Sequence, residues 1–183
     1  MLEFLEELFK TSKITPLKKS GNLKYEAQYQ KQLIIDNGFE VVNVFEDNQS
    51  IIVLYRHFYE DTPKEEETNI ILSLRVITKS GVKHPDPTIK AFFNDIFSEI
   101  NLADIDIKEH MSNEGYGSIL LNNLIKIAIK RNVSMISGWI SSVDEDHIER
   151  LLYFYKKHGF EVVLKETGNK TNNIGDLVWI NNN

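Results

Sequence analysis

The chain has 183 residues, of which 42% are apolar and 26% are charged, and its formal net charge is −6. This size and composition are typical of one globular domain and exclude a disordered or fibrous chain. The acidic balance argues against a nucleic acid or an anionic membrane as the main partner. Because the chain contains no cysteine, disulfides, thiolate metal ligands and cysteine nucleophiles are excluded as well.

The first predicted element is an amphipathic helix over residues 2–10, which is followed by Thr11, Ser12 and Pro16 as helix breakers. This segment is acidic, whereas a secretory signal would be basic and then continuously apolar. No apolar run reaches the length of about 18 residues that a membrane span needs. We therefore expect a cytoplasmic protein.

Residues 23–35 fit either a helix or a strand, because their apolar side chains follow both periods. Their Glu, Ala and Gln content, with Gly38 as a stop signal, favours a helix and completes an N-terminal helical part over residues 1–38. Two β-rich runs at 39–45 and 50–59 then flank a turn, which predicts a hairpin. A third β-rich run covers residues 68–78.

The segment 86–100 is interpreted as an extra helix. Asp86 would cap this helix and Pro87 would occupy its first position. Its apolar residues recur at helical spacing: Ile89, Phe92, Phe93, Ile96, Phe97 and Ile100. We expect this aromatic stripe to belong to the core.

An alternating strand at 102–109, a loop at 110–117 and a long helix at 118–130 come next. The loop ends in Gly115 and Gly117, and two glycines at the start of a helix allow backbone amides to face an anion. The same pair also fits an ordinary tight turn. The spacing matches neither a Walker loop nor a dinucleotide-binding turn.

The last third of the chain predicts a strand over 133–143, a second helix, and two final strands over 160–166 and 175–180. The acidic run 144–146 suits the start of that helix, and Gly159 suits its end.

Two segments resemble motifs of the GNAT acetyltransferase superfamily. Residues 107–117, IKEHMSNEGYG, resemble its acyl-CoA pyrophosphate loop V-x-P-x-x-[RQ]-x-x-G-x-[GA], and residues 154–160, FYKKHGF, resemble its L-Y-x-K-x-G-F motif. Ser112 stands where the family has Arg or Gln, and Glu109 stands where it has proline. The resemblance is specific over residues 101–166.

The resemblance implies an α+β fold with a central mixed, mostly antiparallel twisted sheet flanked by helices. To this plan the sequence adds the N-terminal helix and the extra helix near 86–100, where the family joins two strands by a hairpin. We expect one GNAT-like domain over 1–183, with the acetyl-CoA-binding core at 101–166.

The activity implied by the resemblance is transfer of an acetyl group from acetyl-CoA to an amine, by direct attack in a ternary complex. The family's thiolate-protonating tyrosine falls on Tyr155, although a buried core tyrosine remains an alternative; Tyr153 is the weaker candidate. The amide that polarises the thioester falls near Ile105 to Ile107. The residues expected to bind the cosubstrate are Ile105, Ile107, Ser112, Asn113, Glu114, Gly115, Tyr116, Gly117, Ser118 and Lys157.

Three carboxylates could accept the proton of the incoming amine: Asp104, Asp106 and Glu109. Solvated or salt-bridged roles are the alternative, and many family members use ordered water. Basic residues are enriched around the two motifs, either as CoA contacts or as solvated helix surface: Lys108, Lys126, Lys130, Arg131, Lys156 and Lys157. The histidines show no metal-binding spacing, so no metal site is expected.

The expected partner is a small-molecule or peptide amine, with neither nucleic acid nor membrane. A homodimer stays open, because the sequence does not set the oligomeric state. The alternative to an enzyme is a catalytically inactive GNAT-fold module that binds CoA or another protein.

Overall fold

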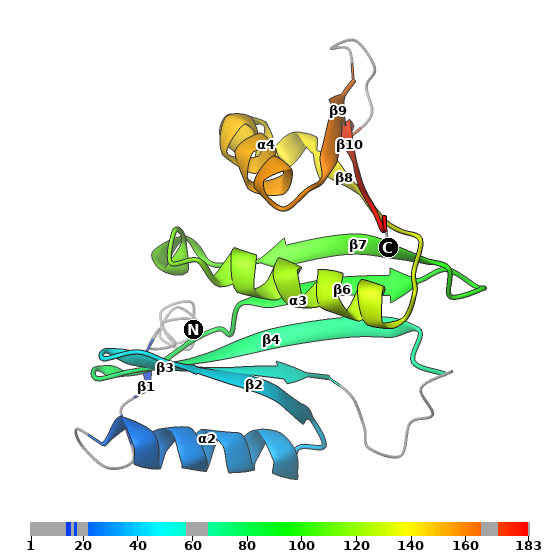
Figure 1. The fold of residues 1–183 in the computed structure, drawn as a ribbon. Helices are drawn as coiled ribbons and strands as arrows, with labels where there is room; N and C mark the ends of the chain where they lie inside the picture. Colours follow the sequence, from blue (N-terminus) through cyan, green and yellow to red (C-terminus); the bar gives the residue numbers. More distant parts are fainter. Residues whose placement is uncertain (1–13, 16, 18–21, 58–65, 166–171, 183) are drawn as a thin grey trace, which may run out of the picture. The chain divides into compact units, whose positions relative to one another are not determined.

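The computed structural model describes residues 14–15, 17, 22–57, 66–165 and 172–182. The helix predicted for residues 2–10 lies outside the described residues. The chain divides into two compact units, which we call unit 1 (residues 1–60 and 73–87) and unit 2 (residues 61–72 and 88–183). The sheet is mixed and mostly antiparallel, with helices at its faces, as the resemblance implies (Figure 1).

Unit 1 begins with the short strand β1 (Ile14–Thr15) and helix α2 (Leu23–Asp36). The helix starts where the Asn22 side chain accepts a hydrogen bond of 2.9 Å from the Tyr25 amide. It ends before Gly38, whose φ of 80° allows the amide of Phe39 to reach back to the carbonyl of Ile34. The ambiguous segment is therefore a helix, as the composition predicts.

The strands of unit 1 are β2 (Glu40–Glu46), β3 (Ser50–Arg56), β4 (Asn69–Thr78), which begins in unit 2, and β5 (Gly81–Lys83). The predicted hairpin is the antiparallel pair β2 and β3, and β5 pairs antiparallel with both β4 and β1. Helix α2 lies against β2 and β3 (Figure 1). Its buried face joins one core cluster: Ala27, Ile34, Ile51, Val53, Tyr55, Ile77 and Val82.

Unit 2 contains β6 (Thr88–Phe93) and β7 (Glu99–Asp106), then a 3-10 turn (Glu109–Met111) and helix α3 (Tyr116–Lys130). Strand β8 (Met135–Ser141) leads through a second 3-10 turn (Ser142–His147) to helix α4 (Ile148–Lys157). Strands β9 (Glu161–Leu164) and β10 (Asn173–Ile180) follow.

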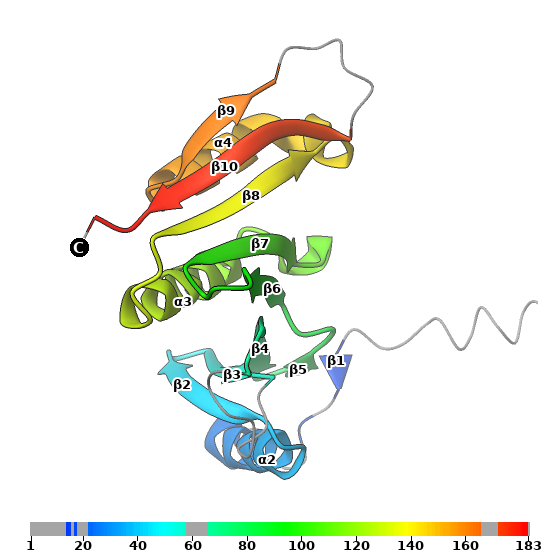
Figure 2. The same ribbon diagram turned by 90° about the vertical axis from the view of Figure 1, so that its right-hand side faces the viewer.

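The strands of unit 2 lie in the order β6, β7, β8, β10, β9. Strands β7 and β8 are parallel, whereas the pairs β6–β7, β8–β10 and β9–β10 are antiparallel. Helix α3 lies against β6 and β8, and α4 covers β9 and its neighbours (Figure 2).

The prediction of a helix over 86–100 is wrong, because this segment forms β6, a turn and the start of β7. Buried and exposed side chains alternate along β6: Ile89 and Phe93 are buried, whereas Phe92 is 44% exposed. The turn is held by the side chain of Asn94, which accepts hydrogen bonds from the amides of Ser98 and Glu99. Alternation and an Asn-based turn therefore override the helical spacing of the apolar residues.

The two ends that the sequence assigned to that helix also have other roles. Asp86 does not cap a helix, since its carboxylate binds Arg75 and the Tyr55 hydroxyl. The carbonyl of Pro87 accepts a hydrogen bond from the amide of Leu74, so the backbone at Pro87 is bonded to strand β4 and does not begin a helix.

Candidate active site

The site of unit 2 begins where β7 and β8 separate. They pair only between residues Glu99–Asn101 and residues Met135–Ser137, although both strands continue beyond this register. Past it the two strands diverge (Figure 2). A β-strand that loses its neighbour in this way leaves backbone groups and side chains free to face a ligand.

A bulge in β7 lies at the same place. On the β6 side the register jumps from Lys90 opposite Asp104 to Ala91 opposite Leu102, which leaves Ala103 as an extra residue. Such a bulge turns backbone groups out of the regular ladder. It therefore brings irregular backbone of β7 to the open side of the split.

The loop after β7 is anchored by one apolar side chain, since Met111 is fully buried. Gly115 precedes α3 with a φ of 82°, a left-handed conformation that disfavours other residues. Within the part of the chain that the structure describes, the amides of Gly117 and Ser118 have no hydrogen-bond partner. Free amides in the first turn of a fifteen-residue helix form a site that favours anions.

Gly117 is small for a packing reason. A Cβ at this position would lie 3.3 Å from the ring of Phe154 and 3.4 Å from the side chain of Ile107. Glycine thus allows α3, α4 and β7 to approach closely. A side chain here would force Phe154 to shift by a few tenths of an ångström, so a substitution at Gly117 would not test ligand binding alone.

Helix α4 positions Tyr155 in the wall of the split. The side chain is only 9% exposed, and its ring makes edge contacts with Phe154 and Phe160. Burial, with the nearby carboxylates Asp144 and Asp104, raises the pKa of Tyr155 to about 12. No described residue forms a hydrogen bond with its hydroxyl, which borders the pocket.

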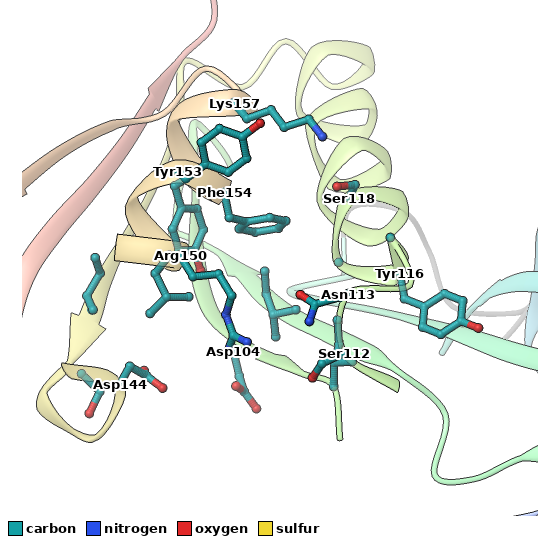
Figure 3. Close-up of a pocket in the computed structure, with 18 of the residues that line it drawn as sticks. Asp104, Ser112, Asn113, Tyr116, Ser118, Asp144, Arg150, Tyr153, Phe154 and Lys157 are labelled. Carbon is teal, nitrogen blue, oxygen red and sulfur yellow. The ribbon is translucent and has the colours of Figure 1, made fainter. Parts of the chain in front are cut away.

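A pocket of about 760 Å³ fills the split (Figure 3). It reaches both sides of β8, because Ile140 is buried while the adjacent Trp139 is 53% exposed, and both line it. Of the residues predicted to form the site, all but Glu114 line this pocket: Ile105, Ile107, Ser112, Asn113, Gly115, Tyr116, Gly117, Ser118, Tyr155 and Lys157.

The structure separates the three candidate carboxylates. Asp104 lines the pocket, whereas Asp106 forms an ion pair of 3.0 Å with Lys108. Glu109 belongs to the exposed face of the 3-10 turn and does not line the pocket. Asp104 is therefore the candidate base that the geometry favours.

The basic residues divide in a similar way. Lys157 lines the pocket and lies near Ser118 of α3 (Figure 3). Lys108 pairs with Asp106, and Arg131 pairs with the buried Glu67 at 2.6 Å. These two cations thus have partners in the fold. No group of His, Asp and Glu among the described residues could hold a metal ion.

Sequence reasoning missed several pocket residues, and three of them bring charge or an exposed aromatic ring: Trp139, Asp144 and Arg150. Asp144 was assigned only to the start of a helix, and it belongs to the 3-10 turn that precedes α4. The exposed Trp139 had a signal, because it falls on the polar side of a strand with alternating burial. Arg150 had none beyond its place in the first turn of α4.

Comparison with solved structures identifies the fold. A GNAT family acetyltransferase from Elizabethkingia anophelis, solved with acetyl-CoA bound, aligns over 74% of this chain and 99% of its own, with 16% identity and a TM-score of 0.50. IAA acetyltransferase from Bacillus cereus aligns over 70% and 99%, with 14% identity and a TM-score of 0.49. The likeness to the Elizabethkingia anophelis structure shows that the chain has the fold of the GNAT acetyltransferases.

Sequence comparison reaches less far. No protein-family model matches the chain. Uncharacterized protein YocC of Bacillus subtilis is 34% identical over 68 residues, which is 37% of this chain and 39% of that protein. The match thus spans well under two thirds of this relative. In the part of the chain that the structure describes, every helix is too short or too polar to cross a membrane.

Proposed function

We propose that this protein is an N-acetyltransferase that moves an acetyl group from acetyl-CoA to an amine. The observation that carries the proposal is the pocket in the split between β7 and β8, which joins free helix amides at one place to an unpartnered buried tyrosine at another. The first feature suits the phosphates of a CoA ester, and the second suits the chemistry at its sulfur.

The residues have separate roles in this proposal. The amides of residues 113–118 and the dipole of α3 bind the pyrophosphate, with Lys157 as a nearby positive charge. Backbone amides of β7 near the bulge and along Ile105 to Ile107 polarise the thioester carbonyl. An amide directed at a developing oxyanion stabilises the transition state more than the ground state.

In the transfer itself, the lone pair of a neutral amine attacks the thioester carbon and a C–N bond forms. The C–S bond then breaks, and its electrons leave with the sulfur of CoA. The Tyr155 hydroxyl gives its proton to that thiolate, while the amine loses its extra proton to Asp104 or to water. With a pKa of about 12, Tyr155 remains protonated at neutral pH and is ready to act as the acid.

Thermal unfolding with and without acetyl-CoA tests the binding part of the proposal. At a hundredfold excess over the dissociation constant, the ligand should stabilise the folded state by about 2.7 kcal/mol. Replacing Gly115 by valine should weaken this effect, because its φ of 82° disfavours a β-branched residue and no atom lies near enough to clash with the new Cβ. No shift at millimolar acetyl-CoA would remove the enzyme proposal.

Release of free thiol in the presence of a panel of amines tests the transfer part. A CoA-binding module without catalysis would show the thermal shift and no thiol release with any amine. The two measurements together therefore separate the enzyme from the binding module.

A further inference from the structure

The pocket has two ends with opposite charge. The Lys157 side chain extends toward Ser118 of α3, whereas Asp104 and Asp144 lie in another part of the pocket (Figure 3). None of these three charged side chains has an ion-pair partner among the described residues. Unpaired charges of two signs, held apart in one pocket, point to two different ligands.

The acidic end does not suit a CoA ester. Phosphate groups would be repelled by Asp104 and Asp144, so these carboxylates face whatever enters the pocket from the other side. Arg150 lines the same end and is likewise without an ion pair among the described residues. With two carboxylates and one guanidinium, this end carries one net negative charge.

A largely buried side chain with an unpartnered, accessible hydroxyl lies near the two carboxylates. The Tyr155 hydroxyl borders the pocket, has no hydrogen-bond partner in the described part of the chain, and belongs to a side chain that is nine-tenths buried. Both Asp104 and Asp144 lie near enough to act on it electrostatically. The two carboxylates therefore lie near the hydroxyl that we propose as the acid of the transfer reaction.

This placement constrains the acceptor. If the reacting ammonium were its only positive charge, two carboxylates would stabilise that charge and hold the nitrogen in its unreactive, protonated form. A second cationic group on the acceptor, which stays charged during the attack, removes this conflict. It pairs with the two carboxylates, so that they no longer stabilise the protonated form of the reacting nitrogen. The exposed indole of Trp139 offers an aromatic face at the same pocket for a cation or for the connecting methylenes.

We propose that the acceptor is a diamine-like molecule, in which one nitrogen is acetylated while a second, cationic nitrogen binds Asp104 and Asp144. Because Asp104 is then paired with this second nitrogen, the proton of the reacting nitrogen goes to water and not to Asp104. This inference rests on the proposed acetyltransferase function and names the substrate class of the same site. Because both carboxylates are exposed, each contact is modest, and together we expect about a tenfold gain.

The test compares three acceptors of equal length: 1,4-diaminobutane, butylamine and 4-aminobutanoate. The kcat/KM for thiol release should be about tenfold higher with the diamine than with butylamine, beyond the advantage of two reactive ends. It should be lowest with 4-aminobutanoate, and the preference for the diamine should shrink as salt is raised. Equal values for the first two amines, or a preference for 4-aminobutanoate through Arg150, would overturn the inference.

Variants locate the effect. Asp144→Asn and Asp104→Asn should each reduce the ratio of the diamine to butylamine, and the double variant should bring it close to one. Asp146→Asn is the matched control, because Asp146 is exposed on the same 3-10 turn and does not line the pocket. A ratio that stays high in the double variant would show that other residues select the diamine.

A binding measurement keeps this inference distinct from the proposed function. In the presence of CoA, 1,4-diaminobutane should raise the melting temperature of the native sequence and of Asp146→Asn, but not that of the double variant. If this pattern appears without any thiol release, the acceptor site stands and the transfer chemistry fails. If the diamine neither stabilises the protein nor reacts, while butylamine does react, the enzyme stands and the diamine inference fails.

Discussion

Each unit contains a deeply buried tyrosine whose pKa is raised, Tyr55 in unit 1 and Tyr155 in unit 2, and the two differ in what surrounds the hydroxyl. Tyr55 of unit 1 is 6% exposed and Tyr155 of unit 2 is 9% exposed, and burial is the largest cause of a raised pKa in both. The Tyr55 hydroxyl donates a hydrogen bond of 2.7 Å to Asp86, whereas the Tyr155 hydroxyl has no partner in the described chain. A raised pKa alone therefore does not distinguish a site from a structural contact.

The neighbours of the two tyrosines extend this contrast. In unit 1, Arg75 donates to both oxygens of Asp86 and also to Gln30, which in turn donates to Glu26. The side chains of this network thus bind one another, so the network needs no ligand. In unit 2, by contrast, the charged groups at the acidic end of the pocket have no ion-pair partner among the residues that the structure describes. Polar groups with partners stabilise a fold, and those without partners are available for chemistry.

The largest expected effect is on turnover in Tyr155→Phe, which removes only the hydroxyl. If Tyr155 protonates the leaving thiolate, kcat for thiol release should fall by roughly 10²–10⁴-fold, while affinity for acetyl-CoA barely changes. Tyr55→Phe is the matched control and should leave kcat within about twofold, because its hydroxyl contributes to stability. Equal kcat in the native protein and Tyr155→Phe, with chemistry rate-limiting, would reassign the acid to water or Tyr153.

The next effect concerns the stability of unit 1. Arg75→Met leaves the carboxylate of Asp86, whose side chain is 11% exposed, without its cationic partner. Removing one member of a buried pair should lower the free energy of unfolding by about 3 kcal/mol. Denaturant titration measures this loss, and acetyl-CoA affinity of the folded variant should stay unchanged. A loss below about 1 kcal/mol would mean that the network is not structural.

The two tyrosines should also make stability depend on alkaline pH. Because the folded pKa of Tyr155 is raised from about 10 to about 12, its contribution is fully present below pH 10 and is lost as pH rises towards 12. The loss from Tyr155 is at most about 2.7 kcal/mol. Denaturant titrations at several pH values between 9 and 11 give the free energy of unfolding as a function of pH. This free energy should fall less steeply with pH in Tyr155→Phe than in the native protein. Identical slopes would contradict the raised pKa.

The secondary structure was predicted more accurately from Asn101 onwards than in the segment before it, and the reason is physical. From Asn101 onwards the loop, both helices and the strand between them were predicted, because glycine positions and helix periodicity encode them locally. The segment 86–100 was misassigned because apolar residues at mixed spacing fit a helix as well as a strand. Its true form depends on pairing between β6 and β7 and on the Asn94 turn.

The site could be predicted only as far as the motifs reached. The resemblance to the two motifs indicated the loop residues and Tyr155, but the charge of the acidic end depends on which residues the fold brings into one pocket. Trp139 comes from β8, Asp144 from the 3-10 turn that follows it, and Arg150 from α4. No local sequence pattern predicts that these three residues line the same pocket as Asp104 of β7.

The smallest expected effect is a gain in affinity at Ser112, which stands where the resembled loop pattern has Arg or Gln. Ser112 is half-buried, lines the pocket, and uses its amide for a hydrogen bond of 3.0 Å to the carbonyl of Glu109. Its backbone is therefore held in place, and a longer side chain should extend from the same position. Arginine would add the positive charge that the loop lacks.

Ser112→Arg should tighten acetyl-CoA binding by about 1 kcal/mol, which is roughly fivefold, because a partly exposed charge-assisted contact is weaker than a desolvated one. Ser112→Gln is the matched control, since it adds length without charge and should give a smaller gain. Titration calorimetry at two salt concentrations measures both, and only the arginine gain should shrink as salt is raised. The exposed Glu114 nearby could capture the guanidinium instead, and Ser112→Arg with Glu114→Gln removes that competition. If this double variant also binds no better than Glu114→Gln alone at low salt, the phosphates do not lie beside residue 112, and the anion site of the loop is confined to the amides at the start of α3.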